Sequence, residues 1–106
     1  MAFGNNMGDL MQHAQEMQKK IRQVQTELKK RVVQGEAGGG MVKVFVNGQQ
    51  EVMKLEIDKE VVDSDDVGML EDLLLVAVKN GLEKSKELSK EEMGRVTGGL
   101  NIPGLF

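Results

Sequence analysis

Few side chains in this sequence have the chemistry that catalysis requires. His13 is the only histidine, and Cys, Tyr and Trp are absent. A catalytic nucleophile needs a neighbouring general base, and no such pair can be assigned without Cys or a second His. His13 falls inside a predicted helix, where a solvated imidazole is the simpler interpretation. We therefore expect no catalytic residues and predict that the protein is not an enzyme.

Two further segments have side chains or backbone that could bind ions. The acidic run 63–66 (DSDD) offers carboxylates to a hard cation, but it lacks the glycine and the bidentate glutamate of a calcium loop. Acidic residues are common where helices begin, so we expect a helix start here. The glycine cluster 35–40 could cradle a phosphate, but no Gly-Lys-Ser/Thr motif and no helix follow it. We expect a turn there, and we predict neither a metal site nor a cofactor.

A row of polar side chains is the stronger candidate for a binding surface. The row occupies positions b and f of a heptad repeat and contains no carboxylate: Gln12, Gln15, Lys19, Arg22, Thr26 and Lys29. Such a basic stripe suits a phosphate backbone, because each phosphate that a cation neutralises releases counterions. The alternative is an ordinary solvated helix face. Few residues are available to stack unpaired bases or to contact base edges, so the stripe favours duplex binding with weak sequence preference.

Charge is divided unevenly along the chain. The formal net charge is −3, yet residues 1–31 carry six Lys and Arg against three Asp and Glu. Residues 32–106 carry eight Lys and Arg against fourteen Asp and Glu. The N-terminal segment is therefore the basic part of an acidic protein.

The stripe depends on a long helix predicted from Met7 to Arg31. Apolar residues recur at alternating steps of three and four, in positions a and d of the heptad: Met7, Leu10, Ala14, Met17, Ile21, Val24 and Leu28. The segment contains no Pro and is rich in good helix formers. An apolar seam this narrow must pack against another helix, in the same chain or in a second one.

Three strands are predicted after this helix. Residues 32–34 are typical of a short strand, which ends at the glycine cluster 35–40. The runs 41–47 and 49–58 alternate apolar and polar residues, and Asn47-Gly48 between them predicts a two-residue type I′ turn. The result is a three-stranded antiparallel meander with one apolar face, which another element must cover.

A second long helix is predicted from about Val67 to Val96, with the acidic run 63–66 supplying its N-cap. Its first half is apolar almost all round, so we expect it to be the most buried element. Its second half is charged, and Gly98-Gly99 ends it. The predicted fold class is α+β, a single domain over residues 1–106 with helix–three strands–helix order and flexible tails at 1–6 and 98–106.

The chain is short and rich in methionine, with eight Met among 106 residues. A domain of this size buries only about two thirds of its unfolded surface, which favours a second chain as a source of stability. No N-terminal signal sequence is recognisable, and the longest apolar run, 73–78, is too short to cross a membrane. The absence of Cys fits a reducing compartment, so we expect a soluble, cytoplasmic protein.

Similarity to the YbaB/EbfC family of bacterial nucleoid-associated proteins is carried by the strings NMGDLMQHAQEMQKKI, GEAGGGMVKVFVNG, VMKLEID, MLEDLLLVAVKNGLEKSKE and GRVTGGLNIPGLF. The resemblance covers nearly the whole chain. It implies a tweezer-like homodimer whose helices project as arms from a central α/β body. It also implies binding of double-stranded DNA with weak sequence preference, a cytoplasmic location at the nucleoid, and a role in gene expression.

Carried over by position, the arms correspond to the first helix and the charged end of the second. The DNA-binding candidates are Lys19, Lys20, Arg22 and Lys29, followed by Lys84, Lys86, Lys90 and Arg95. The candidates for the dimer and core seam are Leu10, Met17, Ile21, Val24, Leu28, Leu70 and Leu74. Gln12 stands where relatives commonly carry a basic residue, which removes one cation from the arm. The expected partners are double-stranded DNA and a second copy of the chain, with no membrane and no small-molecule substrate.

A protein-interaction module is the alternative function. A Met-rich surface and the apolar tail LNIPGLF would then dock a protein of DNA replication or repair. The two functions differ in salt sensitivity, because DNA binding weakens steeply as the salt concentration rises.

Overall fold

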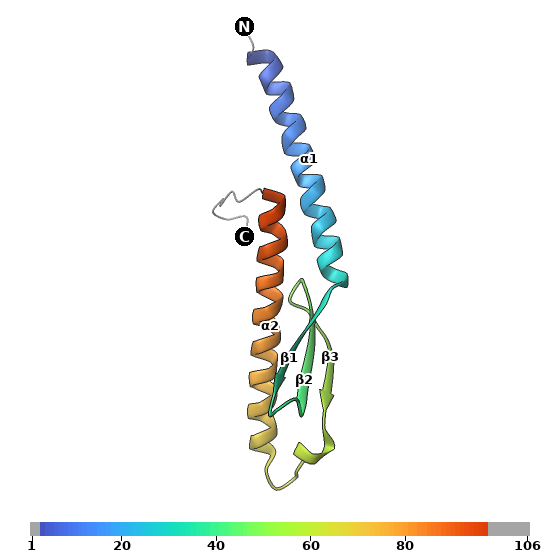
Figure 1. Ribbon diagram of the computed structural model, residues 1–106, viewed down its shortest axis with the longest axis vertical. Coiled ribbons are helices and arrows are strands. Elements are labelled where there is room, and N and C mark those ends of the chain that lie inside the picture. The colour runs from blue at the N-terminus through green and yellow to red at the C-terminus, as the bar shows by residue number, and fades with distance from the viewer. Residues whose placement is uncertain (1–2, 98–106) are drawn as a thin grey trace.

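The computed structural model describes residues 3–97 and shows an elongated molecule of 77 × 22 × 17 Å (Figure 1). Helix α1 (Phe3–Lys30) leads into the strands β1 (Val32–Ala37), β2 (Val42–Asn47) and β3 (Val52–Ile57). A 3-10 turn, η1 (Lys59–Val61), precedes helix α2 (Val67–Thr97). The predicted helix–three strands–helix order is confirmed. The predicted tail at 98–106, with its helix stop at Gly98-Gly99, lies outside the described residues.

Helix α1 begins earlier than the heptad pattern predicts. It starts at Phe3 rather than Met7, so residues 3–6, predicted as part of a flexible tail, belong to the helix. Glycine and asparagine in this segment are weak helix formers, but neither blocks the helical hydrogen bonds as Pro would. At the other end, a single residue, Arg31, separates α1 from β1.

The strands form the predicted antiparallel meander in the order β1-β2-β3. Strand β1 is longer than predicted, because it runs through Gly35 to Ala37 instead of ending at the glycine cluster. Gly35 faces α2 at a point where a Cβ atom would collide with the backbone of Ala77 and Gly81. Gly35 therefore allows the strand to pack closely against the helix. The turn begins three residues later, at Gly38, which has a positive φ of 63°.

The β2–β3 connection differs from the predicted type I′ turn at Asn47-Gly48. Such a turn needs positive φ at both residues, but in this connection only Gln50 has a positive φ, of 60°. The loop is three residues long, because the amide of Asn47 donates to the carbonyl of Glu51 at 2.9 Å. The Asn47 side chain closes the loop, since its Oδ1 accepts from the amides of Gln49 and Glu51 at 2.9 and 3.0 Å. Gly48 is held instead by α1, whose Leu28 carbonyl accepts from its amide.

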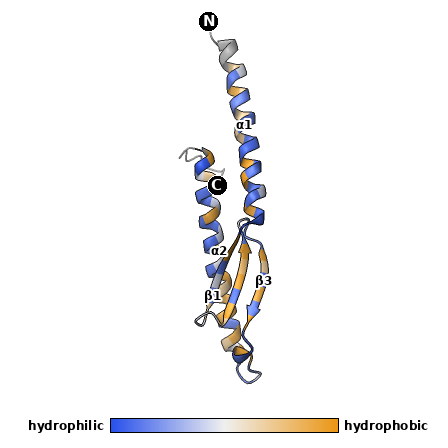
Figure 2. Cartoon of the chain, turned by 45° about the vertical axis from the view of Figure 1, so that its right-hand side comes forward, coloured by the Kyte–Doolittle hydropathy of each residue, from blue (hydrophilic) through white to orange (hydrophobic). Residues whose placement is uncertain are grey.

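The hydrophobic core lies between the sheet and one face of α2. Val42, Val44 and Val46 of β2 are fully buried, and Ala77 of α2 packs against them. The prediction that the first half of α2 is the most buried element is wrong, because Leu75 is 58% exposed and β2 is more deeply buried. A single helix face covers β1 and β2 but leaves β3 exposed along its whole length. Hydrophobic residues therefore remain at the surface of β3 and of α2 (Figure 2).

Helix α2 begins at Val67, as the sequence predicts, and ends at Thr97, one residue beyond the predicted Val96. Asp66 supplies the N-cap, because its Oδ1 accepts from the amide of Met69 at 3.2 Å. Asp63 closes the preceding turn by accepting from the amide of Asp65 at 2.9 Å. The acidic run thus begins a helix, as predicted.

Candidate nucleic-acid interface

Helix α1 projects from the body of the molecule as an arm (Figure 1). Its apolar seam is covered only near the body, where Leu28 is 2% exposed and Val24 and Ile21 are half-buried. Met17 is also half-buried, but Leu10 is 66% exposed. Part of the predicted seam therefore packs against α2 of the same chain, and the part nearest the N-terminus is uncovered within the described residues. The two seam candidates in α2, Leu70 and Leu74, are half-buried against the sheet core.

Gly48, in the β2–β3 turn, anchors the base of the arm. Its amide donates to the carbonyl of Leu28 at 2.8 Å and to that of Arg31 at 3.0 Å. The Leu28 carbonyl also accepts from the amide of Arg31 at 3.2 Å, so the bond from Gly48 gives a carbonyl in the last turn of α1 a second and shorter partner. The contact is also close, because a Cβ on Gly48 would lie 2.7 Å from the Leu28 carbonyl oxygen.

Side chains of the same turn tie the arm to both the sheet and α2. Nδ2 of Asn47 donates to the carbonyl of Lys29 at 3.2 Å, and Nε2 of Gln49 donates to that of Gln25 at 2.7 Å. On the other side, the buried hydroxyl of Ser85 in α2 donates to the carbonyl of Asn47 at 2.6 Å. Asn47 and Ser85 are 1% and 0% exposed, so this junction is shielded from water. The sequence predicted a hairpin here but not its role in holding the arm.

An ion pair links Arg31, the residue that follows α1, to the charged end of α2. Arg31 lies 3.1 Å from Glu92, whose side chain is only 17% exposed. Arg95, a predicted DNA-binding residue, contacts the same Glu92 and also Glu91, each at 3.2 Å. The charge of Arg95 is therefore largely balanced within its own helix.

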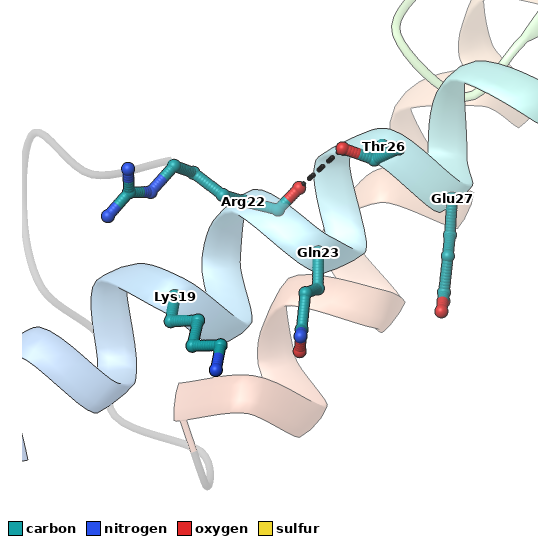
Figure 3. A pocket seen from close by; sticks show the side chains of 5 residues that line it. All are labelled: Lys19, Arg22, Gln23, Thr26 and Glu27. Atoms are coloured by element: carbon teal, nitrogen blue, oxygen red, sulfur yellow. Dashed lines mark hydrogen bonds between the residues drawn. The ribbon is translucent and has the colours of Figure 1, made fainter.

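The predicted basic stripe on α1 is exposed along its whole length: Gln12, Gln15, Lys19, Arg22, Thr26 and Lys29. Lys19, Arg22 and Thr26 line an open hollow of about 690 Å³ together with Gln23 and Glu27. Figure 3 shows Lys19, Gln23 and Glu27 pointing to one side of the helix, while Arg22 extends along the other. The Thr26 hydroxyl donates to the carbonyl of Arg22 at 2.9 Å and so remains turned toward the helix backbone. Glu27 supplies the carboxylate that lines this hollow.

The predicted cations of α2 lie apart from this stripe. Lys84 donates to the carbonyl of Gln34 in β1 at 2.9 Å, which turns it toward the sheet edge. Lys86 and Lys90 are exposed and form no ion pair with another described residue. At about 100° per residue, both face away from the side of α2 that packs on the sheet. Because the stripe of α1 faces away from α2, one protomer does not bring the stripe and these cations together. Lys20, the remaining candidate of α1, lies instead on the side of α2 and lines one hollow with Arg95 and Glu92.

Other candidate chemistry is sparse in the part of the chain that the structure describes. His13 is exposed on α1. Among these residues, no three His, Cys, Asp or Glu side chains are grouped closely enough to hold a metal ion. None of the described helices is long and apolar enough to span a membrane.

Two relatives share nearly half of their residues with this chain. It is 48% identical over 103 residues to a nucleoid-associated protein of Thermoanaerobacter pseudethanolicus, covering 97% of this chain and 93% of that protein. It is 50% identical over 104 residues to a nucleoid-associated protein of Desulforamulus reducens, covering 98% of this chain and 99% of that protein. Both similarities extend over α1, the sheet and α2.

A solved structure and a family profile agree with these relatives. The fold is similar to the crystal structure of an uncharacterized protein, HP0035, from Helicobacter pylori, with a TM-score of 0.74 and 28% sequence identity. The match covers 92% of this chain and 99% of that one. The profile of the YbaB/EbfC DNA-binding family matches residues 3–100. The chain therefore belongs to the YbaB/EbfC DNA-binding family, as its sequence motifs predict.

Proposed function

We propose that the protein binds double-stranded DNA as a homodimer, through the exposed basic face of α1. The observation that carries this proposal is that Lys19, Arg22 and Lys29 are exposed and start within about 80° of one another around a projecting helix, at about 100° per residue. None of the three forms an ion pair with another described residue. Unpaired cations can neutralise phosphates, which supplies the sequence-independent part of DNA affinity. Family membership supports the same function, and the two relatives are named nucleoid-associated proteins.

Weak sequence preference follows from the kind of contact. Lysine meets a phosphate as a point charge, and phosphate contacts carry no base sequence. The acidic residues around the start of α2 lie at the end of the molecule farthest from the arm, where they repel DNA least (Figure 1). Binding of this kind would place the protein at the nucleoid and let it influence gene expression.

Strand β3 supports the homodimer. Its outer edge pairs with no other described strand, and its Leu55 and Ile57 are 48% and 38% exposed. Leu55 lies opposite Val44 and Ile57 opposite Val42, so both face the side of the sheet that α2 partly covers. An open edge with apolar side chains tends to associate with another chain. A second copy packed here would bury both residues.

Helix α2 adds an apolar flank beside β3. Asn80 and Lys84 donate to carbonyls of β1 at 3.1 and 2.9 Å, so this flank of α2 closes the β1 edge of the sheet. Leu75 precedes Lys84 by nine positions, which places it about 180° away, on the flank toward β3. It is 58% exposed. The chain thus covers one sheet edge itself and leaves the other, with its apolar surroundings, for the partner.

Reversal of charge on the arm tests the DNA interface. Lys19→Glu with Arg22→Glu should lower the affinity for unrelated labelled duplexes by roughly tenfold or more at low salt, measured by fluorescence anisotropy. Lys59→Glu with Lys79→Glu is the matched control, because it makes the same change in net charge on exposed residues of the body. An unchanged affinity in the arm variant, or an equal loss in the control, would contradict the proposed interface.

A further inference from the structure

The apolar seam of α1 extends beyond the end of α2. Ile21 and Val24 are half-buried beside α2, whereas Leu10 is 66% and Met7 is 64% exposed. The seam spacing continues between these two pairs through Met17. A helix with one apolar face gains stability only when that face is buried. The outer half of the seam therefore needs a cover that residues 7–96 do not supply.

The end of α2 lies beside the start of this uncovered seam. Val96 lines one hollow with Lys20 and Val24 of α1. The two helices run in opposite directions, so the chain leaves α2 heading along α1 toward its N-terminus (Figure 1). The residues after Thr97 therefore begin at the point along α1 beyond which α2 no longer covers the seam.

We propose that residues 98–106 of the same chain cover the outer seam, following α1 from Met17 toward Met7. This segment, GGLNIPGLF, has no charged side chain and carries apolar residues at Leu100, Ile102 and Phe106. Extended at about 3.3 Å per residue, it reaches roughly 30 Å. The outer seam spans about 15 Å, at a rise of about 1.5 Å per residue. The segment is therefore long enough to cover the seam even with bends at its glycines.

Chemistry and connectivity favour this segment over another chain. An uncharged apolar segment suits the seam and not the basic stripe on the opposite face of α1. Its attachment at Thr97 gives it an effective concentration at the seam in about the millimolar range. A covered seam leaves Lys19 and Arg22 exposed, so the docked segment and a phosphate backbone can occupy the arm together.

Engineered disulfides test the contact directly. The chain has no Cys, so any disulfide reports only the pair that is introduced. Ala14→Cys with Ile102→Cys should form an intrachain disulfide under mild oxidation, visible as a protomer-sized band of altered mobility on a non-reducing gel. Gln15→Cys with Ile102→Cys is the matched control, because Gln15 lies on the stripe, and it should react several-fold more slowly. Equal rates in the two pairs would overturn the proposal.

The same experiment separates the other occupants of the seam. A product of twice the protomer mass from the Ala14→Cys, Ile102→Cys variant would show that a second copy lies there and would overturn the proposal. Mixing the two single-cysteine variants should accordingly give little interchain product. A slow reaction in both cysteine pairs would show that residues 98–106 do not lie on the seam, which would then be free to bind a different protein. That result would also overturn the proposal.

Hydrogen exchange gives a second readout that needs no cysteine. Ile102→Asp should speed exchange of the amides at 7–17 several-fold, because a charged residue no longer docks on the apolar seam. Asn101→Asp introduces the same charge one residue away and should leave the exchange nearly unchanged. Equal exchange in the wild type and in Ile102→Asp would contradict docking of the segment.

Discussion

The amide of Gly48 donates a 2.8 Å hydrogen bond to the carbonyl of Leu28, joining the β2–β3 turn to the base of the arm. The two residues are also in close contact, since a Cβ on Gly48 would lie 2.7 Å from the Leu28 carbonyl oxygen. Leu28 is 2% exposed, so it has little room to move aside. The direction in which α1 projects therefore depends on a glycine at this position.

Gly48→Ala should destabilise the protein by about 1–3 kcal/mol, the usual effect of forcing extra atoms into a packed site. Urea denaturation measures the change in the free energy of unfolding. Gly68→Ala is the control, because a Cβ there meets nothing within 4 Å and should not destabilise. Unaltered stability of Gly48→Ala would show that the turn does not anchor α1.

Gly35→Ala should be more damaging, with a loss of about 3 kcal/mol or more, because the new Cβ would meet backbone atoms that cannot rotate away. Thermal unfolding measures the loss. Gly94→Ala, where a Cβ would meet nothing within 4 Å, should instead stabilise α2 by about 0.5–1 kcal/mol. A Gly35→Ala protein as stable as the wild type would contradict the close approach of β1 to α2.

Ser85→Ala tests the buried link between α2 and the turn. The Ser85 hydroxyl donates to the carbonyl of Asn47 at 2.6 Å and accepts from the amide of Gln50 at 3.1 Å. Its removal leaves the Asn47 carbonyl with only the longer bond from the Gln50 amide, at 3.2 Å, which should lower stability by about 0.5–1.5 kcal/mol in urea denaturation. Ser89→Ala, at a partly exposed position of the same helix, should change stability much less. Equal effects of the two substitutions would argue against the link.

The fold was largely predictable because its elements are encoded locally. The heptad from Met7 to Leu28 predicts α1, and the alternation in Val42, Val44 and Val46 predicts a strand with one buried face. The N-cap role of Asp66 is also local, because its side chain accepts from the amide of Met69, three residues along the chain.

The errors arise where distant segments meet. Gly35 resembles a strand breaker in sequence, and only its contact with Gly81, far along the chain, explains why the strand continues. The hairpin loop departs from type I′ because α1 accepts hydrogen bonds from Gly48. Leu75 is apolar, so its sequence predicts a core position. A single helix is too narrow to cover all three strands, however, and Leu75 lies on a part of α2 that remains exposed. For the candidate site, the exposed stripe on α1 could be predicted from periodicity, whereas the pairing of Arg95 with Glu91 and Glu92 could not.

Ile57→Asp should weaken the homodimer, because it places a carboxylate in the apolar surface that we assign to the partner. Sedimentation velocity should show the protomer mass in place of the dimer mass at micromolar concentration. Lys54→Asp is the control, since Lys54 lies on the opposite face of β3, over the ring of Phe45. A dimer that survives Ile57→Asp, or a wild type that sediments as a protomer, would contradict the assignment of β3.

The dependence of duplex affinity on salt concentration tests the central claim most directly. Lys19, Arg22 and Lys29 from each of two protomers offer six cations, so a plot of log K against log salt concentration should have a slope of about −5. Fluorescence anisotropy with two unrelated duplexes should give the same slope and similar affinities. A flat salt dependence, or no binding to either duplex in dilute buffer, would contradict DNA binding by the basic face of α1.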